Sequence, residues 1–202
     1  MSSIVFNEYE AFSQHIGEAA VSMRITSLEE EKWIIQQANA GSVRMQQGYE
    51  GGGSIAEGAT FLDGWVFYHH SCPGHANGRS LTHHEVVAAP PGSDFCLVCH
   101  PAHEWLTVFV PTSLLFTSPS GLEISSFARL QLLTPPPQVT RTYTSLVRRF
   151  LAVAEARPCV LISPAAVEAF QLDLIRAVSE LFLRDQQATD RHSARWLRQA
   201  KS

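Results

Sequence analysis

The sequence predicts an α+β protein in which an antiparallel β-barrel or sandwich is followed by a C-terminal helical hairpin. Three observations lead to this fold class. Residues 20–110 contain short apolar segments separated by glycine and proline turns, with no helical pattern between them, which is typical of an all-β domain. A segment rich in Ser, Thr and Pro follows at 117–138. From residue 143 onward, apolar residues recur at helical spacing.

A short opening helix is predicted at 7–17, with Asn7 as its N-cap, Phe12 in its apolar stripe and Gly17 at its end. Asp63 and Gly64 lie between two apolar runs, and this pattern predicts a β-hairpin. Eight strands are predicted between the turns, at 21–25, 32–39, 43–49, 55–62, 65–70, 84–88, 94–100 and 105–110.

The C-terminal part is predicted to be helical. Residues 111–116 form a single turn, 117–138 form a connector, and helices follow at 143–156 and 164–187, before a short basic segment at 190–201. Ser163 is the expected N-cap of the longer helix and Pro164 lies in its first turn. We therefore expect two units, a β-barrel sensing domain at 1–125 and a helical dimerisation segment at 126–202.

The helix at 164–187 is apolar over more than one face, because Leu172, Ile175 and Phe182 widen its main stripe. Such a helix is expected to pack on the barrel with one face and on another helix or subunit with the other. Burial of both faces within one chain is the alternative. The residues expected to pair subunits are Val167, Phe170, Leu174, Val178 and Leu181.

Composition excludes several classes of protein. The 202 residues are 45% hydrophobic and 17% charged, which supports a packed core and argues against disorder. No apolar run approaches about 18 residues, so no membrane span is expected. The N-terminus lacks the pattern of a secretory signal, which predicts a cytoplasmic protein without disulfides among Cys72, Cys96, Cys99 and Cys159.

Four segments carry a family resemblance: 64–68 (GWVFY), 78–81 (GRSL), 86–92 (VVAAPPG) and 105–111 (WLTVFVP). Their order resembles the N-terminal regulatory domain of AraC-family transcriptional regulators, closest to the branch of the ethanolamine-operon regulator. The resemblance implies a cupin-like barrel that senses a small-molecule effector, helices that form a homodimer, and a C-terminal helix-turn-helix domain that reads DNA.

The resemblance also implies that the DNA-reading part is absent from these 202 residues. The residues resembling the start of the helix that leads into it are Arg191, Arg195, Trp196 and Leu197. Residues 1–140 carry 5 Lys and Arg against 13 Asp and Glu, whereas 141–202 carry 10 against 6. An acidic domain repels phosphate, so we expect DNA contact only through the absent domain. A stand-alone interaction module is a further alternative.

Aromatic residues on alternating strand positions are the expected lining of an effector pocket. One phase of the 65–70 strand presents Trp65, Phe67 and His69, and the other presents Val66, Tyr68 and His70. The residues expected to contact the ligand are Trp33, Phe61, Trp65, Phe67 and His69.

Cysteine and histidine patterns raise the question of a metal or haem. Residues 96–100 match the C-x-x-C-H haem pattern, and Cys72-x₂-His75 with Cys96-x₂-Cys99 offers zinc ligands, with His100 and His103 nearby. Because 95–99 reads as an extended strand, whose positions i and i+3 face opposite sides, we expect neither cofactor.

The pairs His69-His70 and His83-His84 do not supply the H-x-H ligands of a metal cupin, since adjacent strand residues point to opposite faces. We therefore expect no catalytic residue and no enzyme, and a metal-dependent cupin enzyme remains the alternative.

Overall fold

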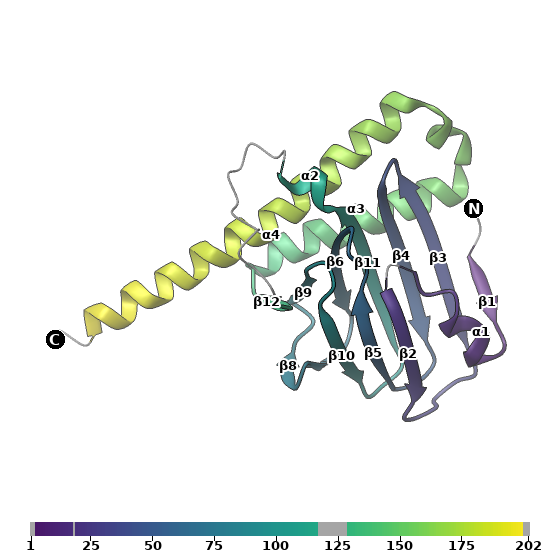
Figure 1. The fold of residues 1–202 in the computed structure, drawn as a ribbon, viewed down its shortest axis with the longest axis horizontal. Helices are drawn as coiled ribbons and strands as arrows, with labels where there is room; N and C mark the ends of the chain where they lie inside the picture. Colours follow the sequence, from purple (N-terminus) through teal and green to yellow (C-terminus); the bar gives the residue numbers. More distant parts are fainter. Residues whose placement is uncertain (1–2, 18, 117–128, 200–202) are drawn as a thin grey trace.

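The computed structural model describes residues 3–17, 19–116 and 129–199, with side chains for all of these except Phe116 and 186–199. The elements form three layers (Figure 1): a five-stranded sheet, a seven-stranded sheet behind it, and two long helices on the far face of the larger sheet. This arrangement confirms the α+β class.

The seven-stranded sheet is entirely antiparallel and has the order β1-β3-β4-β11-β6-β9-β12. Its centre is β11, where Thr107 lies opposite Gln46 of β4 on one side and Tyr68 of β6 on the other. The strands are β1 (Ile4–Phe6), β3 (Trp33–Ala40), β4 (Val43–Glu50), β6 (Gly64–His70), β9 (Val86–Ala89), β11 (His103–Pro111) and β12 (Gln131–Leu133).

The five-stranded sheet is also antiparallel, in the order β2-β5-β10-β7-β8. A tight turn joins its last two strands, with positive φ at Asn77 (47°) and Gly78 (75°), the backbone that favours Asn-Gly in hairpins. The strands are β2 (Ala19–Ile25), β5 (Ser54–Thr60), β7 (Gly74–Ala76), β8 (Arg79–Leu81) and β10 (Asp94–Cys99). The sequence patterns did not predict the short strands β1, β7, β8 and β12.

The hairpin predicted at Asp63 and Gly64 is wrong. Strands β5 and β6 belong to different sheets, so this connection crosses from one sheet to the other. Gly64 is needed for another reason: a Cβ at this position would lie 2.4 Å from the Phe109 ring. The glycine therefore marks a close approach between β6 and β11 rather than a two-residue turn. The pairings give two sheets with edge strands, so closure into a barrel stays a prediction.

Helix α1 (Tyr9–Ser13) is shorter than predicted and begins after Glu8, without a side-chain cap, so the N-cap predicted at Asn7 is wrong. Helix α2 (Thr112–Phe116) agrees with the predicted single turn. Of the predicted connector, 117–128 lies outside the described residues, while its end forms β12 and the start of α3 (Pro137–Ala156).

A 3₁₀ turn, η2 (Pro158–Ile162), joins α3 to α4 (Pro164–Gln199). The predicted basic segment at 190–201 therefore continues α4 as far as Gln199, and its side chains lie outside the described residues. No helix in the described ranges combines the length and the hydropathy needed to span a bilayer.

The largest hydrophobic core lies between the helices and the seven-stranded sheet. The Phe182 ring of α4 packs edge-on against Trp65 and Phe67 of β6, with centroid distances of 5.8 and 5.7 Å. The buried Tyr143 hydroxyl of α3 donates a hydrogen bond of 3.1 Å to the Phe67 carbonyl. Both helices are thus held to the same strand.

The apolar stripe of α4 packs within its own chain. Leu174, Val178 and Leu181 are each 0% exposed and belong to the core beneath the sheet. Val167 is half-buried, and the Phe170 ring lies 4.7 Å from that of Phe150 on α3. The structure therefore does not present the five residues predicted for subunit pairing as a free face. It matches the alternative in which the sheet and α3 bury this stripe.

Replacing Leu174 with alanine is expected to lower the free energy of unfolding by about 2–5 kcal/mol, since it leaves a cavity at a fully buried site. Leu172→Ala is the matched control on the same helix, because Leu172 is 46% exposed, and its effect is expected to stay below about 1 kcal/mol. Urea denaturation at low protein concentration measures both. Equal losses would contradict the orientation of α4.

Candidate functional site

An apolar cavity of about 70 Å³ lies between the two sheets. The five-stranded sheet contributes one wall, from β2, β5 and β10, and the seven-stranded sheet contributes the other, from β4, β6, β9 and β11. The first wall includes Val21, Met23, Ala56, Phe95 and Leu97, and the second includes Val66, Tyr68, Val87, Ala89 and Thr107. A concave, mostly apolar site of this kind is the usual form of a small-molecule site.

The phase of β6 decides which side chains reach this cavity. Val66 and Tyr68 line it, whereas Trp65 and Phe67 point to the opposite face and contact α4. Trp65 and Phe67, two of the residues predicted to contact the ligand, therefore face the helices and not the cavity. The phase Val66, Tyr68 and His70 is the one that faces the second sheet.

The other predicted ligand residues also lie outside the cavity lining. Trp33 is buried beside α1, with its ring 5.8 Å from that of Tyr9, in a cluster that also contains the cavity residue Trp105. Phe61 is 47% exposed in the connection between β5 and β6. The structure therefore does not bring the five residues together in one site.

His69 is buried, and its Nε2 donates a 2.9 Å hydrogen bond to the His83 carbonyl. Burial lowers the pKa of His69 to about 4 by disfavouring the charged imidazolium, and the charges of His70, Arg148 and His83 act in the same direction. The bond to the His83 carbonyl opposes this shift only in part. His69 therefore acts as a neutral structural group at neutral pH.

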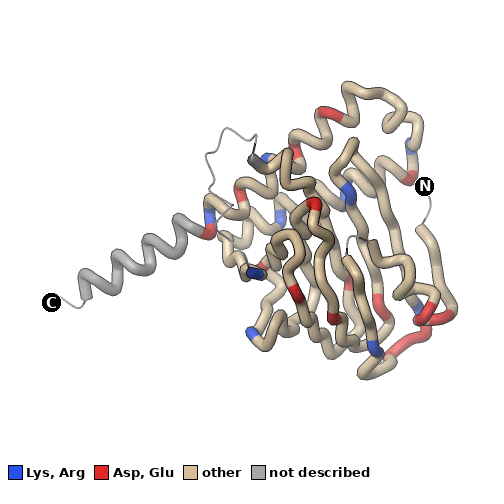
Figure 2. The backbone as a smooth tube through the Cα atoms, in the orientation of Figure 1, with Lys and Arg blue, Asp and Glu red and all other residues tan. Residues whose placement is uncertain are grey.

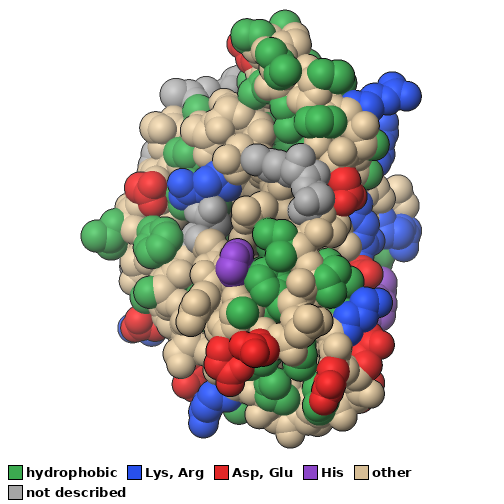
Figure 3. Space-filling model, turned by 90° about the vertical axis from the view of Figure 1, so that its right-hand side faces the viewer, with side chains coloured by type: hydrophobic (Ala, Val, Ile, Leu, Met, Phe, Trp, Pro, Cys, Tyr) green, Lys and Arg blue, Asp and Glu red, His purple; other side chains and the backbone are tan. Residues whose placement is uncertain are grey.

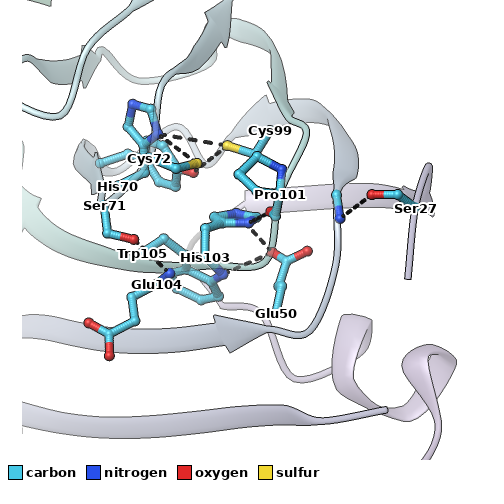
Figure 4. Close-up of polar contacts among 12 residues, drawn as sticks. Ser27, Glu50, His70, Ser71, Cys72, Cys99, Pro101, His103, Glu104 and Trp105 are labelled. Atoms are coloured by element: carbon cyan, nitrogen blue, oxygen red, sulfur yellow. Dashed lines mark hydrogen bonds and ion pairs between the residues drawn. The ribbon is translucent and has the colours of Figure 1, made fainter. Parts of the chain in front are cut away.

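One end of the cavity is polar, and Figure 4 shows its side chains. The Trp105 indole Nε1 donates a 2.9 Å hydrogen bond to Oε1 of Glu50. The ring needs Gly48 on the neighbouring strand, because a Cβ there would lie 2.1 Å from the indole. His103 donates from Nδ1 to the Pro101 carbonyl (3.0 Å), while its Nε2 lies 3.8 Å from the same Glu50 oxygen.

Glu50 is only 3% exposed, and burial raises the pKa of its carboxyl group. The charge of His103 and the hydrogen bond from Trp105 counteract this shift. The second oxygen, Oε2, is buried and accepts no hydrogen bond from any described residue. The hydroxyl of Thr107, another cavity residue, is also buried and has no hydrogen-bond partner among the described residues. Buried unpaired polar atoms are costly, so these two are candidates for contact with a ligand.

Three donor atoms converge beside this polar end: Nδ1 of His70 and the Sγ atoms of Cys72 and Cys99 lie within 4.8 Å of one another. Nδ1 is 3.9 Å from Cys72 Sγ and 3.8 Å from Cys99 Sγ (Figure 4). His70 ends β6, Cys72 follows it in the connection to β7, and Cys99 ends β10. The cluster therefore joins residues from the two sheets.

The pKa values of the two thiols shift in opposite directions. Proximity to Cys99 and to His70 lowers the pKa of Cys72, and the same interaction between the thiols, together with burial, raises the pKa of Cys99.

The metal-ligand pairs suggested by sequence spacing do not form. Cys96 and Cys99 face opposite sides of β10, and Cys96 Sγ contacts the Glu57 carboxylate at 3.6 Å instead. The side chain of His75 is exposed. Sequence reasoning missed Glu50 and the grouping of His70 with Cys72 and Cys99. The signal that could have pointed to His70 was a histidine at the end of the apolar strand β6.

No protein-family model and no curated protein matches this sequence. Among solved structures, the fold is similar to the crystal structure of the AraC-like transcriptional activator CuxR, with a TM-score of 0.62 and 14% sequence identity. The similarity covers 88% of this chain and 69% of that one. The two chains thus share a fold.

The stability of the protein is expected to fall on acidification because folded His69 resists protonation. The pKa of His69 is about 4 in the folded protein and 6.5 for the free side chain. The contribution of His69 to the free energy of unfolding is therefore present above pH 6.5 and is lost as the pH falls toward 4. The loss from this group between pH 7.5 and 5 is about 2 kcal/mol. Urea denaturation at both pH values should show it in the wild type and in the exposed-site control His75→Gln. The His69→Gln variant should lose about 2 kcal/mol less than the wild type between these pH values. An equal loss of unfolding free energy in the variant and the wild type would contradict the assignment to His69.

Proposed function

We propose that this chain is the ligand-sensing and dimerisation domain of an AraC-type transcriptional regulator and acts without catalysing a reaction. Three observations support the proposal: the fold is shared with an AraC-like activator, an apolar cavity lies between two sheets, and two helices pack on the opposite face. In this proposal the two sheets correspond to the halves of a flattened, cupin-like barrel. The ethanolamine-operon branch stays a prediction from sequence alone.

The observation that carries the sensing role is the cavity with a buried carboxylate in its wall. Its volume of about 70 Å³ limits an effector to a few heavy atoms unless side chains move. Its walls favour apolar groups, and the unpaired Oε2 of Glu50 favours a hydrogen-bond donor. We therefore assign the effector to small, mostly apolar molecules that carry one amine or hydroxyl group.

DNA recognition is assigned to a C-terminal helix-turn-helix domain of the whole regulator rather than to these residues. Figure 2 shows that acidic residues run along the β2–β3 connection, which contains Glu29, Glu30 and Glu31, whereas Lys and Arg form no such run in the described chain beyond the pair Arg148 and Arg149. Such a surface does not attract the phosphate backbone.

Subunit pairing is assigned to the solvent side of α4, because its other side is occupied by the sheet and α3. The exposed positions Ala165, Ala169 and Leu172 follow Ile162 of η2 at heptad-like spacing. Ile162 is 79% exposed and Leu172 46%. Figure 3 shows apolar side chains gathered at the top of the molecule, over the α3–α4 turn. A twofold contact through this surface would remove them from water.

A thermal-shift screen tests the sensing role. Small amines and alcohols with an apolar body are expected to stabilise the protein, and carboxylates of the same shape are not. Glu50→Gln should weaken the best ligand about 10-fold or more, since a charge-assisted hydrogen bond becomes a neutral one. Ala56→Trp, which fills the cavity, should abolish binding. Glu57→Gln is the control, because Glu57 lies on β5 next to Ala56 and its side chain is 51% exposed. Undiminished binding to both test variants would overturn the site.

Sedimentation equilibrium tests the pairing surface. A charge placed at the solvent side of α4, Leu172→Glu, is expected to weaken a wild-type dimer at least about 10-fold, because each buried leucine contributes roughly 1.5–3 kcal/mol. Leu62→Glu is the control, since Leu62 is 85% exposed and lies in the connection between β5 and β6. A wild type that stays monomeric at tens of micromolar would refute dimerisation through this chain.

A further inference from the structure

The effector site proposed above does not use the cluster of His70, Cys72 and Cys99, although Cys99 lies in the wall of the cavity. We propose that these three residues bind a thiophilic divalent transition metal ion, for which Zn²⁺ is the best match, at the polar end of the cavity. This goes beyond the sensing function and reverses the expectation that no metal is bound. The sequence candidate included Cys72 and Cys99 but paired them with Cys96, His75, His100 and His103 rather than with His70.

The donor set matches this class of ion. Thiolates and imidazole are the ligands that Zn²⁺ prefers, and two cysteines with one histidine leave the fourth tetrahedral position to water or another ligand. All three residues are buried, with exposures of 0% for His70, 8% for Cys72 and 4% for Cys99. A donor set of sulfur and nitrogen disfavours the harder, oxygen-preferring ions.

The spacing of the donor atoms is close to that of a bound site. With Zn–N near 2.05 Å and Zn–S near 2.3 Å, the tetrahedral angle places nitrogen and sulfur about 3.5 Å apart. The two observed Nδ1–Sγ distances are 3.8 and 3.9 Å. A contraction of a few tenths of an ångström therefore brings His70 within bonding distance of an ion held between the sulfurs.

Without an ion, the His70 ring is poorly satisfied. Its Nδ1 meets only the two sulfurs, at distances typical of weak contacts, and its Nε2 is buried with no partner among the described residues. Burial of an imidazole in this condition costs free energy. A metal bond would replace the two weak contacts of Nδ1 with one strong partner.

Charge favours the same conclusion. Two thiolates and a neutral imidazole cancel the charge of a divalent ion, so the occupied site is neutral overall and tolerates burial. Because His70 lies on β6 and Cys99 on β10, the ion would tie the two sheets together beside the cavity.

The wild-type protein gives the first test. Reduced apo-protein is expected to bind one equivalent of Zn²⁺, measured by competition with a chromogenic chelator, and Co²⁺ should produce thiolate-to-cobalt charge-transfer absorption. Zn²⁺ should also protect Cys72 and Cys99 from alkylation, as read by peptide mass spectrometry, while Cys96 and Cys159 still react. Absence of stoichiometric binding by the reduced protein would overturn the proposal, as would a Cys72–Cys99 disulfide in freshly purified protein whose reduction leaves no affinity for zinc.

Variants give the second test. Cys72→Ser and Cys99→Ser are each expected to weaken Zn²⁺ binding by at least about 100-fold, because loss of a ligand exceeds the 10–100-fold effect of an outer-shell partner. Cys96→Ser is the matched control, since it removes a cysteine of the same strand that faces away from the cluster, and its affinity should match the wild type. Equal losses in Cys96→Ser and Cys99→Ser would overturn the site. The alkylation pattern of the wild type decides the matter even if a variant fails to fold.

Discussion

The central strands β6, β9 and β11 of the seven-stranded sheet are buried on both faces, and the rest of the structure depends on this constraint. One face of β6 and β11 packs against α3 and α4, and the other lines the cavity beneath the second sheet. These central strands must therefore supply two sets of apolar side chains of different shape. Bulky rings such as Trp65 and Phe67 lie under the helices, where Phe182 fills the space between them. Smaller groups such as Val66 and Ala89 lie on the other side and leave room for the cavity.

This double burial explains what the sequence could and could not predict. Strands β6 and β11 were predictable because a glycine begins the apolar run of β6 and a proline ends that of β11, and β4 was predictable because Gly41 and Gly51 flank it. The phase of β6 could not be predicted. Trp65 and Phe67 on one face and Val66 and Tyr68 on the other are all apolar, so the alternation does not show which face lines the cavity. The stripe of α4 was predictable as apolar, but spacing alone could not tell whether Leu174 meets its own sheet or a second subunit.

The polar end of the cavity depends on contacts between residues far apart in the sequence. Cys99 meets His70 because β7 pairs with β10 and the turn after β6 brings Cys72 to the same corner. Glu50 meets Trp105 because β4 and β11 are neighbours in register. No local motif encodes such encounters. The spacing rules for zinc ligands instead favoured Cys96, which lies on the wrong side of its strand.

The alternation of side chains along β6 also has a mechanical consequence. Tyr68, in the wall of the cavity, follows directly after Phe67, which touches Phe182 of α4 and whose carbonyl accepts the hydrogen bond of Tyr143 from α3. A single strand thus forms the partition between the two compartments. Any shift of the β6 backbone near Phe67 and Tyr68 therefore changes the cavity wall and the contacts of both helices at the same time.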